Sequence, residues 1–339
     1  MTGIGKIPSK IIHGYSGGHT YMRRSFTYSI SNREMNQTVE QLLLSRGYSR
    51  HLIIDLKKSP EYLTIGGEHV YISHRMAEGE ILQVLLPEEI SSEKIVPTPM
   101  SLDIVYEDED LMVINKTADT PIHPSQGNFE NTLANGVAWH YKQLGEPFTY
   151  RVINRLDRDT TGLLILAKHA LSACILSEMI QRREIHRTYL AAVSGKLSPV
   201  AAESADDVTE NHWQTISAPI ARVDGSTIER CVDYDRGETA ITHYRLLSYS
   251  PTLDVSLLEL KLETGRTHQI RVHMKHLGHP LFGDFLYNPD YRYIKRQSLH
   301  SWKLSFLHPI TKEPLSFTAA VPDDMKLFTK SEVPLDNDF

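Results

Sequence analysis

Apolar residues in the first quarter of the chain repeat with helical spacing and then change to short runs. Across residues 38–59 the apolar positions that fit a helix face are Val39, Leu42, Leu43, Ile53, Ile54 and Leu56. Gly47 interrupts the pattern, so we expect two short helices. Residues 62–87 are typical of short strands. Residues 27–89 are therefore predicted to form a small α+β module, which at about 60 residues is marginal as an independent fold.

Two segments around this module lack a regular pattern. Residues 1–26 contain basic residues, glycine and serine but no apolar core run, so they are not a secretory signal and we expect a flexible leader. Residues 90–101 contain two prolines and three serines, which is typical of a linker. The small module is thus expected to be joined to the remainder by a short connection.

From residue 102 onward, strand patterns outnumber helix patterns and come mostly in runs. The predicted strands lie in 104–116 (a pair with an acidic turn), 150–156, 163–167, 186–195, 232–248 and 254–263, and the predicted helices are 130–144, 169–183 and 267–278. This order favours an α+β domain over residues 102–325 with a mixed or antiparallel sheet. We expect an acidic solvated loop at 203–210 and an acidic, frayed tail at 326–339.

Bulk composition restricts the function only a little. The chain has 339 residues with a formal net charge of −6, so any nucleic-acid partner must be bound by a local basic patch. Cys174 and Cys231 are far apart and lack metal-ligand spacing, which favours two reduced thiols. No apolar run reaches the ~18 residues of a membrane span. We expect a cytoplasmic protein, and a monomer by default.

Residues 154–162 concentrate charge in a way that folding alone does not require. These nine residues include two arginines, the acids Asp157 and Asp159, two threonines and a glycine. A neighbouring arginine keeps a carboxylate ionised. Such a carboxylate is either a nucleophile, half of a buried ion pair, or a cap for the turn. This pattern alone does not distinguish Asp157 from Asp159.

Two segments near the C-terminus carry basic residues. In the helix at 267–278, Ile270, Met274 and Leu277 share an apolar face, and a second, basic face is formed by His268, Arg271 and Lys275. Residues 291–303 contain four lysines or arginines and three aromatic residues without an acid. Such segments suit phosphate contacts and base stacking. The alternative for each is a solvated charged surface.

Histidines in 263–279 raise the question of zinc. His268, His273, His276 and His279 match neither the H-E-x-x-H motif nor a cysteine-containing pattern. His268 and His273 are five residues apart and do not share a helix face. Only His276 and His279 have a compatible spacing, and Gly278 ends the helix between them. We therefore predict no metal site.

Four motifs, in this order, resemble those of the RluA-type pseudouridine synthases. RLDRDTTGLLILAK resembles the R-L-D-x-x-T-S-G-L-x-L-x-A-K motif of that family, and YEDEDLMVINK with the later IHPS resembles the segment before it. HRTYLAAVSG resembles the K-x-Y-x-A-x-V-x-G strand. ETGRTHQIRVHMKHLGHPLFGDFLY resembles the T-G-R-x-H-Q-I-R-x-H block that continues to G-D-x-x-Y. The agreement covers residues 102–322, and residues 27–89 resemble the small RNA-binding module that many of these enzymes carry.

The resemblance implies an isomerase that converts uridine in structured RNA to pseudouridine, with ribosomal RNA favoured and transfer RNA as the alternative. It implies no metal, ATP or organic cofactor. Asp157 takes the position of the nucleophile, and Asp159 is left as a turn or ion-pair residue. Tyr189 takes the position of the tyrosine that stacks on the target base, and Arg271 that of the arginine paired with the aspartate.

RNA contacts are implied at four further positions. Arg155 matches the arginine that enters the RNA and exposes the flipped nucleotide. Arg266 and His268 are expected to contact phosphate or support the site, and Lys275 is expected to bind RNA from the basic helix face. The alternative for each of these side chains is a purely structural role. For Tyr189 that role is to pack in the core of the sheet.

The chain departs from the family pattern at three places. Asn154 stands where histidine is common, Thr161 where serine is common, and residues 115–119 read NKTAD instead of N-K-P-A-G. None of these replaces Asp157, so we expect activity. Two other classes of function compete: a non-catalytic RNA-binding or assembly protein with this fold, and a glycosidase, which needs paired carboxylates.

Overall fold

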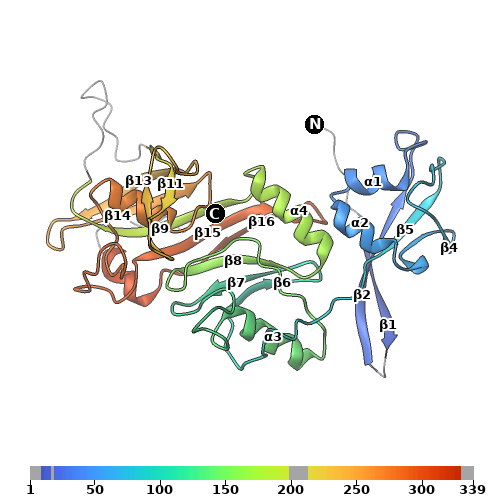
Figure 1. Cartoon of the computed structure of the whole chain (residues 1–339), viewed down its shortest axis with the longest axis horizontal. Coiled ribbons are helices and arrows are strands. Elements are labelled where there is room, and N and C mark those ends of the chain that lie inside the picture. The colour runs from blue at the N-terminus through green and yellow to red at the C-terminus, as the bar shows by residue number, and fades with distance from the viewer. Residues whose placement is uncertain (1–8, 17–18, 198–212, 330–339) are drawn as a thin grey trace.

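The structure is a computed structural model that describes residues 9–16, 19–197 and 213–329 (Figure 1). The N-terminal module, at the right of Figure 1, contains a five-stranded sheet and two helices. Its elements are β1 (Ser9–Ser16), β2 (His19–Ser29), α1 (Val39–Ser45), α2 (Arg50–Leu56), η1 (Pro60–Tyr62), β3 (Leu63–Ile65), β4 (Glu68–His69) and β5 (Ile81–Leu85). The order of strands is β1-β2-β5-β3-β4, and every pairing is antiparallel.

The two predicted short helices of this module are confirmed. Thr38 caps α1 through a capping box with Gln41, and Ser49 caps α2 by accepting the backbone N–H of Leu52. Gly47 lies between the helices at φ +90°, a conformation that glycine adopts without strain. A Cβ at Gly47 would lie 2.7 Å from Ile175 of the following domain, so this turn also permits close contact between the two parts.

Residues 9–16 and 19–26 differ from the flexible leader expected for residues 1–26, whose remaining positions lie outside the described residues. β1 and β2 form a hairpin, and β2 continues the sheet by pairing with β5. The reason lies in the alternation at the end of β2, where Phe26, Tyr28 and the following Ile30 are all buried on one face. The expectation missed this face because it treated residues 1–26 as a unit and so separated Phe26 from Tyr28.

The larger domain is built on a nine-stranded sheet. Its elements are β6 (Ile104–Glu107), β7 (Leu111–Lys116), α3 (Leu133–Leu144), β8 (Thr161–Ala167), α4 (Ala170–Gln181), β9 (His186–Ser194), β10 (Gln214–Ser217), β11 (Ile220–Arg222), β12 (Arg230–Val232), β13 (Ile241–Ser250), β14 (Val255–Leu262), α5 (Gln269–His276), β15 (Leu299–Leu307), β16 (Pro314–Thr318) and η2 (Asp323–Thr329). The strand order is β10-β13-β14-β9-β15-β8-β7-β6, with β16 also paired to β15 and with β11 and β12 forming a separate ribbon.

The predicted α+β class with a mixed sheet is confirmed. In the nine-stranded sheet β15 and β8 run parallel, and the other pairings among described strands are antiparallel. The single parallel pair joins two distant parts of the chain, because His300 lies beside Thr161. The beginning of β8 is thus held in the centre of the sheet, directly after the charged loop.

The strand predicted at 150–156 is not formed. Only Val152 makes an isolated bridge, to Leu166. The side chain of Asn154 accepts a hydrogen bond from the backbone N–H of Ile165 at 2.9 Å, and this bond takes the place of a backbone hydrogen bond between strands. The chain therefore leaves the sheet early, and residues 153–160 form an irregular loop at the edge of β8.

Two apolar cores cover the opposite faces of the large sheet, and β8 contributes to both. All seven residues of β8 are buried. Leu163 and Ile165 face the core shared with α4, and Leu164 and Leu166 face the core shared with α3 and α5. A strand buried on both faces reads as a continuous apolar run, which explains the sequence GLLILA.

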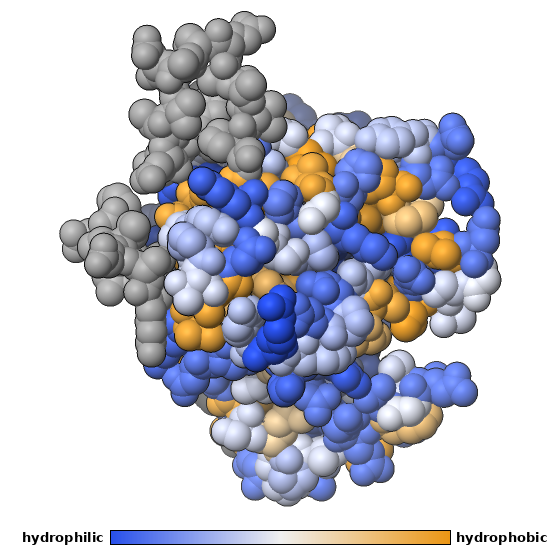
Figure 2. Space-filling model, turned by 90° about the vertical axis from the view of Figure 1, so that its left-hand side faces the viewer, coloured by the Kyte–Doolittle hydropathy of each residue, from blue (hydrophilic) through white to orange (hydrophobic). Residues whose placement is uncertain are grey.

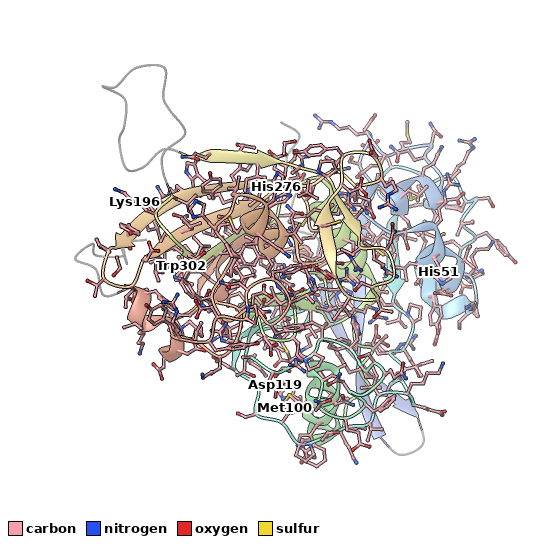
Figure 3. All side chains as sticks on the ribbon, turned by 60° about the vertical axis from the view of Figure 1, so that its left-hand side comes forward. His51, Met100, Asp119, Lys196, His276 and Trp302 are labelled. Carbon is pink, nitrogen blue, oxygen red and sulfur yellow. The ribbon has the colours of Figure 1, made fainter. Side chains whose placement is uncertain are left out.

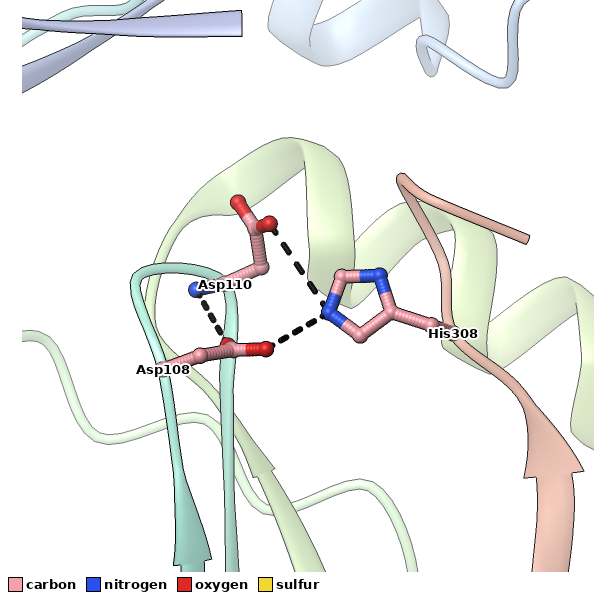
Figure 4. Close-up of side chains that lie close together, drawn as sticks. All are labelled: Asp108, Asp110 and His308. Carbon is pink, nitrogen blue, oxygen red and sulfur yellow. Dashed lines mark hydrogen bonds and ion pairs between the residues drawn. The ribbon is translucent and has the colours of Figure 1, made fainter. Parts of the chain in front are cut away.

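The N-terminal module and α4 belong to the same core, with α4 facing the module in Figure 1. A buried acid, Asp110, lies beside this core. Asp110 accepts hydrogen bonds from Arg24 of β2 at 2.6 Å and from His169 at 2.8 Å. Figure 4 shows its neighbours Asp108 and His308, whose Nε2 bonds to Asp108 at 2.8 Å. The module therefore docks through apolar packing and a buried ion pair.

Residues 90–101 contain no helix or strand, as expected for the connection, but they pack against α3. The carbonyl of Val96 accepts a hydrogen bond from Asn135, and Ser91 accepts one from the backbone of Phe148. The acidic loop expected at 203–210 lies outside the described residues, as does the tail from residue 330 on. Residues 326–329, expected in the frayed tail, instead belong to η2, where Phe328 is buried in an apolar cluster. Cys174 and Cys231 are free thiols. No described helix is long and apolar enough to cross a membrane.

Residues 291–303 form the charged surface considered above only in part: Tyr291, Arg292 and Lys295 are exposed, whereas the segment from Arg296 to Trp302 is buried. The Arg296 side chain is 7% exposed and its guanidinium is bound by Asp324 at 2.7 and 2.8 Å. It also donates to the main-chain carbonyls of Asp159 and Leu299. Trp302 is buried in a third apolar cluster. On the face drawn in Figure 2, hydrophilic residues predominate between hydrophobic patches.

Candidate active site

The charged loop at 153–160 is held from both sides by hydrogen bonds to its main chain. Lys116, at the end of β7, donates to the carbonyl of Arg158 at 2.7 Å. Arg296 donates to the carbonyl of Asp159 at 3.2 Å, and Gln297 donates to the Thr160 hydroxyl. Because these partners are buried, the loop presents Asp157 from a fixed support.

Asp157 is paired with Arg271 of α5. Nη1 of Arg271 donates to Oδ2 of Asp157 at 2.9 Å, across 114 residues of sequence. The Asp157 side chain is 28% exposed, whereas that of Arg271 is 2% exposed. The carboxylate therefore keeps an open side toward solvent while its inner oxygen is held by a buried cation.

A third residue, Asp284, holds Arg271 from behind. Its oxygens accept Nε and Nη2 of Arg271 at 2.7 and 2.8 Å, which is the bidentate geometry of strong carboxylate–guanidinium pairs. Asp284 is fully buried and also accepts the backbone N–H groups of Leu286 and Tyr287. Burial alone would lower the pKa of Arg271, but the bonds and charges of Asp284 and Asp157 raise it, so the guanidinium stays charged.

Sequence reasoning missed Asp284. The residue stands in the G-D pair of the last family motif, but an acid after a loop glycine has no periodic pattern that would mark it as buried. Its position also changes the interpretation of the predicted basic face of α5. Arg271 is buried and neutralised, Lys275 is exposed, and His268 lies between them in exposure, so the three do not form a continuous basic surface.

Tyr287 and His268 lie beside this pair and support it. The ring of Tyr287 lies 5.0 Å from the Arg271 guanidinium, and its hydroxyl bonds to Nδ1 of His268 at 3.0 Å. His268 precedes α5 at φ +60°, and its Nε2 lies 3.9 Å from Oδ2 of Asp157. Burial lowers the pKa of His268, against the attraction of Asp157, so the imidazole favours its neutral form.

The turn at residues 115–119 contains a backbone conformation that glycine usually adopts, although the sequence NKTAD has no glycine. Asp119 adopts φ +51°, a left-handed conformation that aspartate tolerates better than most residues. Its backbone N–H donates to the Asp159 carboxylate at 3.2 Å. Lys116 donates to the carbonyls of Thr117 and Thr120 as well as to that of Arg158. The missing proline–glycine pair is thus accommodated locally; Figure 3 labels Asp119 on this segment.

The other two departures from the family pattern also have structural roles. Asn154 terminates the ladder at Ile165, as described above. The hydroxyl of Thr161 bonds to Nδ1 of the buried His300 at 2.9 Å. Burial lowers the pKa of His300 to about 4, so this imidazole is neutral at physiological pH. Within the described part of the chain, no hydrogen bond joins either side chain to Asp157.

Asp159 lies differently from Asp157. Its carboxylate is near Arg158 at 3.4 Å and accepts the backbone N–H of Asp119. The side chain is 13% exposed and does not line the cavity in front of Asp157. The geometry thus separates the two acids: one faces a cavity beside a buried arginine, and the other stabilises a turn.

A cavity of about 870 Å³, the catalytic cavity, opens in front of Asp157. Tyr189 of β9 lines it and is 3% exposed, with its main chain between β14 and β15. Arg187 lies two residues earlier on the same face of β9 and also lines the cavity. Its Nε is buried without a hydrogen-bond partner in the described part of the chain. Arg187 is a second residue to which sequence reasoning assigned no role.

The predicted RNA-contacting residues occupy different positions around the catalytic cavity. Arg155 is exposed and lines it. Arg266 also lines it, but its guanidinium is paired with Glu238 and donates to the carbonyl of Thr239. Lys275 is exposed, lies 5.2 Å from the Tyr287 ring and lines neither this cavity nor the smaller one beside Arg271.

The histidines considered for zinc have other partners. Both ring nitrogens of His273 are bonded, one to the Thr242 hydroxyl and one to the carbonyl of Ala218. Nδ1 of His279 bonds to the carbonyl of Ser194. His276 lies at the end of α5, where Figure 3 labels it. The best-clustered group in the described residues is Asp108, Asp110 and His308. His308 Nδ1 accepts backbone N–H groups, so its Nε2 carries the proton toward Asp108.

The mixed sheet places Asp157, buried Arg271 and Tyr189 around one small cavity, as the resemblance to the pseudouridine synthases implies. Residues 110–276 match the model of the RNA pseudouridylate synthase family. The chain belongs to the RNA pseudouridine synthases of the RluA type, and it is an isomerase that acts on RNA. The resemblance inferred from the motifs is thereby confirmed.

Several relatives show the extent of this similarity. The chain is 41% identical over 295 residues to an uncharacterized RNA pseudouridine synthase, YjbO, of Bacillus subtilis (strain 168), covering 87% of this chain and 99% of the relative. It is 33% identical over 320 residues to ribosomal large subunit pseudouridine synthase D of Escherichia coli (strain K12), covering 89% and 93%. The solved structure of human RNA pseudouridylate synthase domain containing 1 is similar with a TM-score of 0.51 and 26% identity, over 65% of this chain and 83% of that one.

Proposed function

We propose that this enzyme isomerises specific uridines of ribosomal RNA to pseudouridine, with Asp157 as the nucleophile. The substrate class is supported by the relative that is named a ribosomal large subunit pseudouridine synthase and that aligns with 89% of the chain. The observation that carries the chemistry is the pairing of Asp157, which is partly exposed and lines the catalytic cavity, with buried Arg271. The proposed site of action is the cytoplasm, with a monomer as the working unit.

Asp157 is suited to attack because its two oxygens have different surroundings. Oδ2 is held by Arg271, so the orientation of the carboxylate is fixed. The other oxygen is left for the substrate, either at the ribose anomeric carbon or at the uracil ring. In both routes the bond from the sugar to N1 breaks, the bond to C5 forms, C5 loses its proton and N1 gains one.

The detached uracil must stay in place while it turns from N1 to C5. Tyr189 is placed on the wall of the catalytic cavity, where its ring can stack on the base. Arg187, on the same strand face, also lines that cavity, and its guanidinium is suited to hold a uracil carbonyl oxygen. A base held in this way rejoins the ribose instead of being lost to water.

The remaining contacts serve the RNA around the target. Arg155, exposed at the entrance, is proposed to enter the space left by the flipped nucleotide. Arg266, His268 and Lys275 are proposed to contact the backbone or to support groups that do. The module at 27–89 is proposed to add a second RNA contact, joined through residues 90–101 to the catalytic domain at 102–325.

A map of pseudouridine in total RNA tests the substrate class directly. The map compares cells with the gene, cells without it, and deleted cells that express the intact chain. We expect one or a few ribosomal RNA sites to lose the modification on deletion and to regain it on complementation. Loss confined to transfer RNA would overturn the ribosomal assignment, and an unchanged map in both RNA classes would overturn the proposed function.

A further inference from the structure

The ribbon formed by β11 and β12 places two arginines side by side. Arg222 at the end of β11 lies directly opposite Arg230 at the start of β12. Residues opposite each other in an antiparallel pair have Cβ atoms about 5 Å apart, and like charges there are destabilising. This pair of arginines thus weakens the ribbon unless an anion lies between or beside the two guanidinium groups.

Neither arginine has a carboxylate partner among the described residues. Arg222 is exposed and makes no hydrogen bond with its side chain in this part of the chain. Arg230 donates Nη1 to the carbonyl of Glu229 at 2.9 Å. Arg236, which follows the ribbon, is paired with Asp224 and Asp233. The acids beside the ribbon therefore neutralise Arg236 and leave the cross-strand pair with its charge.

These two side chains line a cavity of about 350 Å³, which we name the arginine pocket. The residues that line it are Arg155, Ile220, Ala221, Arg222, Arg230, Arg236, Glu238, Gly265, Arg266 and Thr267. Glu238 is paired with Arg266, as noted above. Three cations, Arg155, Arg222 and Arg230, remain without an acid partner in the structure as described. Converging guanidinium groups are the donors that proteins use for phosphate.

The arginine pocket continues into the catalytic cavity. Arg155, Gly265, Arg266 and Thr267 line both, and Arg155 is two residues from Asp157. A second connection runs through Tyr287. Its hydroxyl accepts the backbone N–H of Arg230 at 2.9 Å, and its ring supports the guanidinium of Arg271. The position of the ribbon is thus tied to the pair that holds Asp157.

We propose that the arginine pocket binds one backbone phosphate of the RNA, within two nucleotides of the uridine that enters the catalytic cavity. This inference rests on the proposed function and adds the position of a phosphate to it. Flipping a nucleotide rotates its backbone, and a phosphate held beside it fixes the rotated strand. Arg222 and Arg230 act on binding, because the chemistry takes place in the neighbouring cavity.

The test combines a variant of the protein with neutral positions in the RNA. An RNA substrate is made as a series, each member with a single uncharged methylphosphonate linkage at a different place around the target. Each is assayed with the wild type, with Arg222→Gln and with the double variant Arg222→Gln/Arg230→Gln. The matched control is Arg292→Gln, since the guanidinium of Arg292 is already paired with Asp290 at 2.7 Å.

We expect one linkage near the target at which neutralisation raises the wild-type KM about tenfold and leaves kcat nearly unchanged. Neutralising that linkage does not raise the KM of the double variant further, because the guanidinium groups that bind the phosphate charge are absent. Arg292→Gln behaves as the wild type. The single variant Arg222→Gln, whose side chain is exposed and makes no described bond, keeps the test valid if the double variant is unstable.

Other outcomes overturn the proposal. If neutralising each linkage changes KM equally in the wild type and the variants, the arginine pocket binds no backbone phosphate. If inorganic phosphate or uridine monophosphate competes at micromolar concentration while no linkage responds, the pocket takes a free phosphate instead of the RNA backbone. If the wild type makes no pseudouridine, the proposed function fails, and the same series measured as RNA dissociation constants still tests the pocket.

Discussion

At the residue scale, the site consists of one buried cation that donates hydrogen bonds to two acids. Arg271 gives two N–H donors to fully buried Asp284 and one to half-exposed Asp157. Two negative charges therefore share one guanidinium, and Asp157 receives only part of its attraction. This division orients Asp157 without a full bidentate pair, in which both of its oxygens would be occupied.

Replacing Asp284 by asparagine tests this division. Asp284→Asn keeps the size but removes the charge, so Arg271 shifts toward Asp157 and occupies both of its oxygens. We expect kcat to fall at least tenfold with little change in KM. We also expect a loss of about 3 kcal/mol in the free energy of unfolding, the typical cost of breaking a buried pair. Single-turnover kinetics and urea denaturation measure the two effects.

The matched control is Asp290→Asn, which removes an acid from a mostly exposed pair with Arg292. Such pairs contribute about 0–1 kcal/mol. A variant Asp284→Asn with wild-type turnover would show that Asp284 stabilises the fold without positioning the catalytic pair.

Residue roles were partly predictable. The motifs placed Asp157, Tyr189 and Arg271 in order, and the geometry brings these three to one cavity. The burial of Arg271 was not predictable, because it depends on Asp284, whose position in a loop has no periodicity. Arg296 was misread for the same reason: its partner Asp324 and the carbonyl of Asp159 are distant in sequence, so its charge looked solvated.

At the element scale, the site depends on the position of β8 beside β15. Gly162, the second residue of β8, has φ +108° and lies against the main chain of Ser301. A Cβ at this position would be 2.2 Å from the carbonyl oxygen of Ser301. The glycine thus permits the parallel contact that fixes the end of the catalytic loop.

Substituting this glycine is expected to move the loop. Gly162→Ala forces a strained backbone and separates β8 from β15. We expect the free energy of unfolding to fall by ~3 kcal/mol or more, since backbone strain and overpacking add. The control is Gly145→Ala at the end of α3, which has φ +71° and open space around its Cβ position and loses only about 1–2 kcal/mol. Equal losses in urea denaturation would show that the contact with Ser301 is unimportant.

Elements with a strong pattern were predicted well, and irregular ones were not. The capping residues Thr38 and Ser49 and the continuous apolar run of β8 mark their elements within the local sequence. Residues 150–156 have a strand pattern, but the side chain of Asn154 takes the place of a ladder bond. A side chain that competes with the backbone in this way is visible only when the neighbouring strand is known.

At the scale of the whole molecule, the small module is joined to the catalytic domain by a common core and a buried acid. A module of this size is marginal alone, and the packing of Gly47 against Ile175 shows where the larger domain supports it. Asp110 is the polar part of that contact. Burial would raise its pKa, but the hydrogen bond from His169 and the charge of Arg24 outweigh burial and lower the pKa.

This junction is expected to weaken in acid. A carboxyl whose pKa is lowered by folding contributes stability above its unfolded pKa of about 4, and the contribution is lost as pH falls through the folded pKa. Asp110→Asn should lower the free energy of unfolding by about 2–3 kcal/mol at pH 7. Between pH 5 and pH 2, the free energy of unfolding of Asp110→Asn should also fall less than that of the wild type.

Urea denaturation at several pH values measures this difference. Asp55→Asn, which removes the half-buried partner of exposed Lys58, serves as the control and should follow the wild type. Parallel pH profiles for Asp110→Asn and the wild type would show that Asp110 does not carry the acid sensitivity of the junction.

The measurement that tests the account most directly is single-turnover pseudouridine formation by Asp157→Asn, with Asp159→Asn as its neighbour control. On an unmodified ribosomal RNA fragment that contains the target uridine, we expect no detectable product with Asp157→Asn, an RNA dissociation constant within about threefold of the wild type, and product formation by Asp159→Asn within about tenfold of it. Turnover by Asp157→Asn at the wild-type rate would contradict the assignment of Asp157 as the nucleophile.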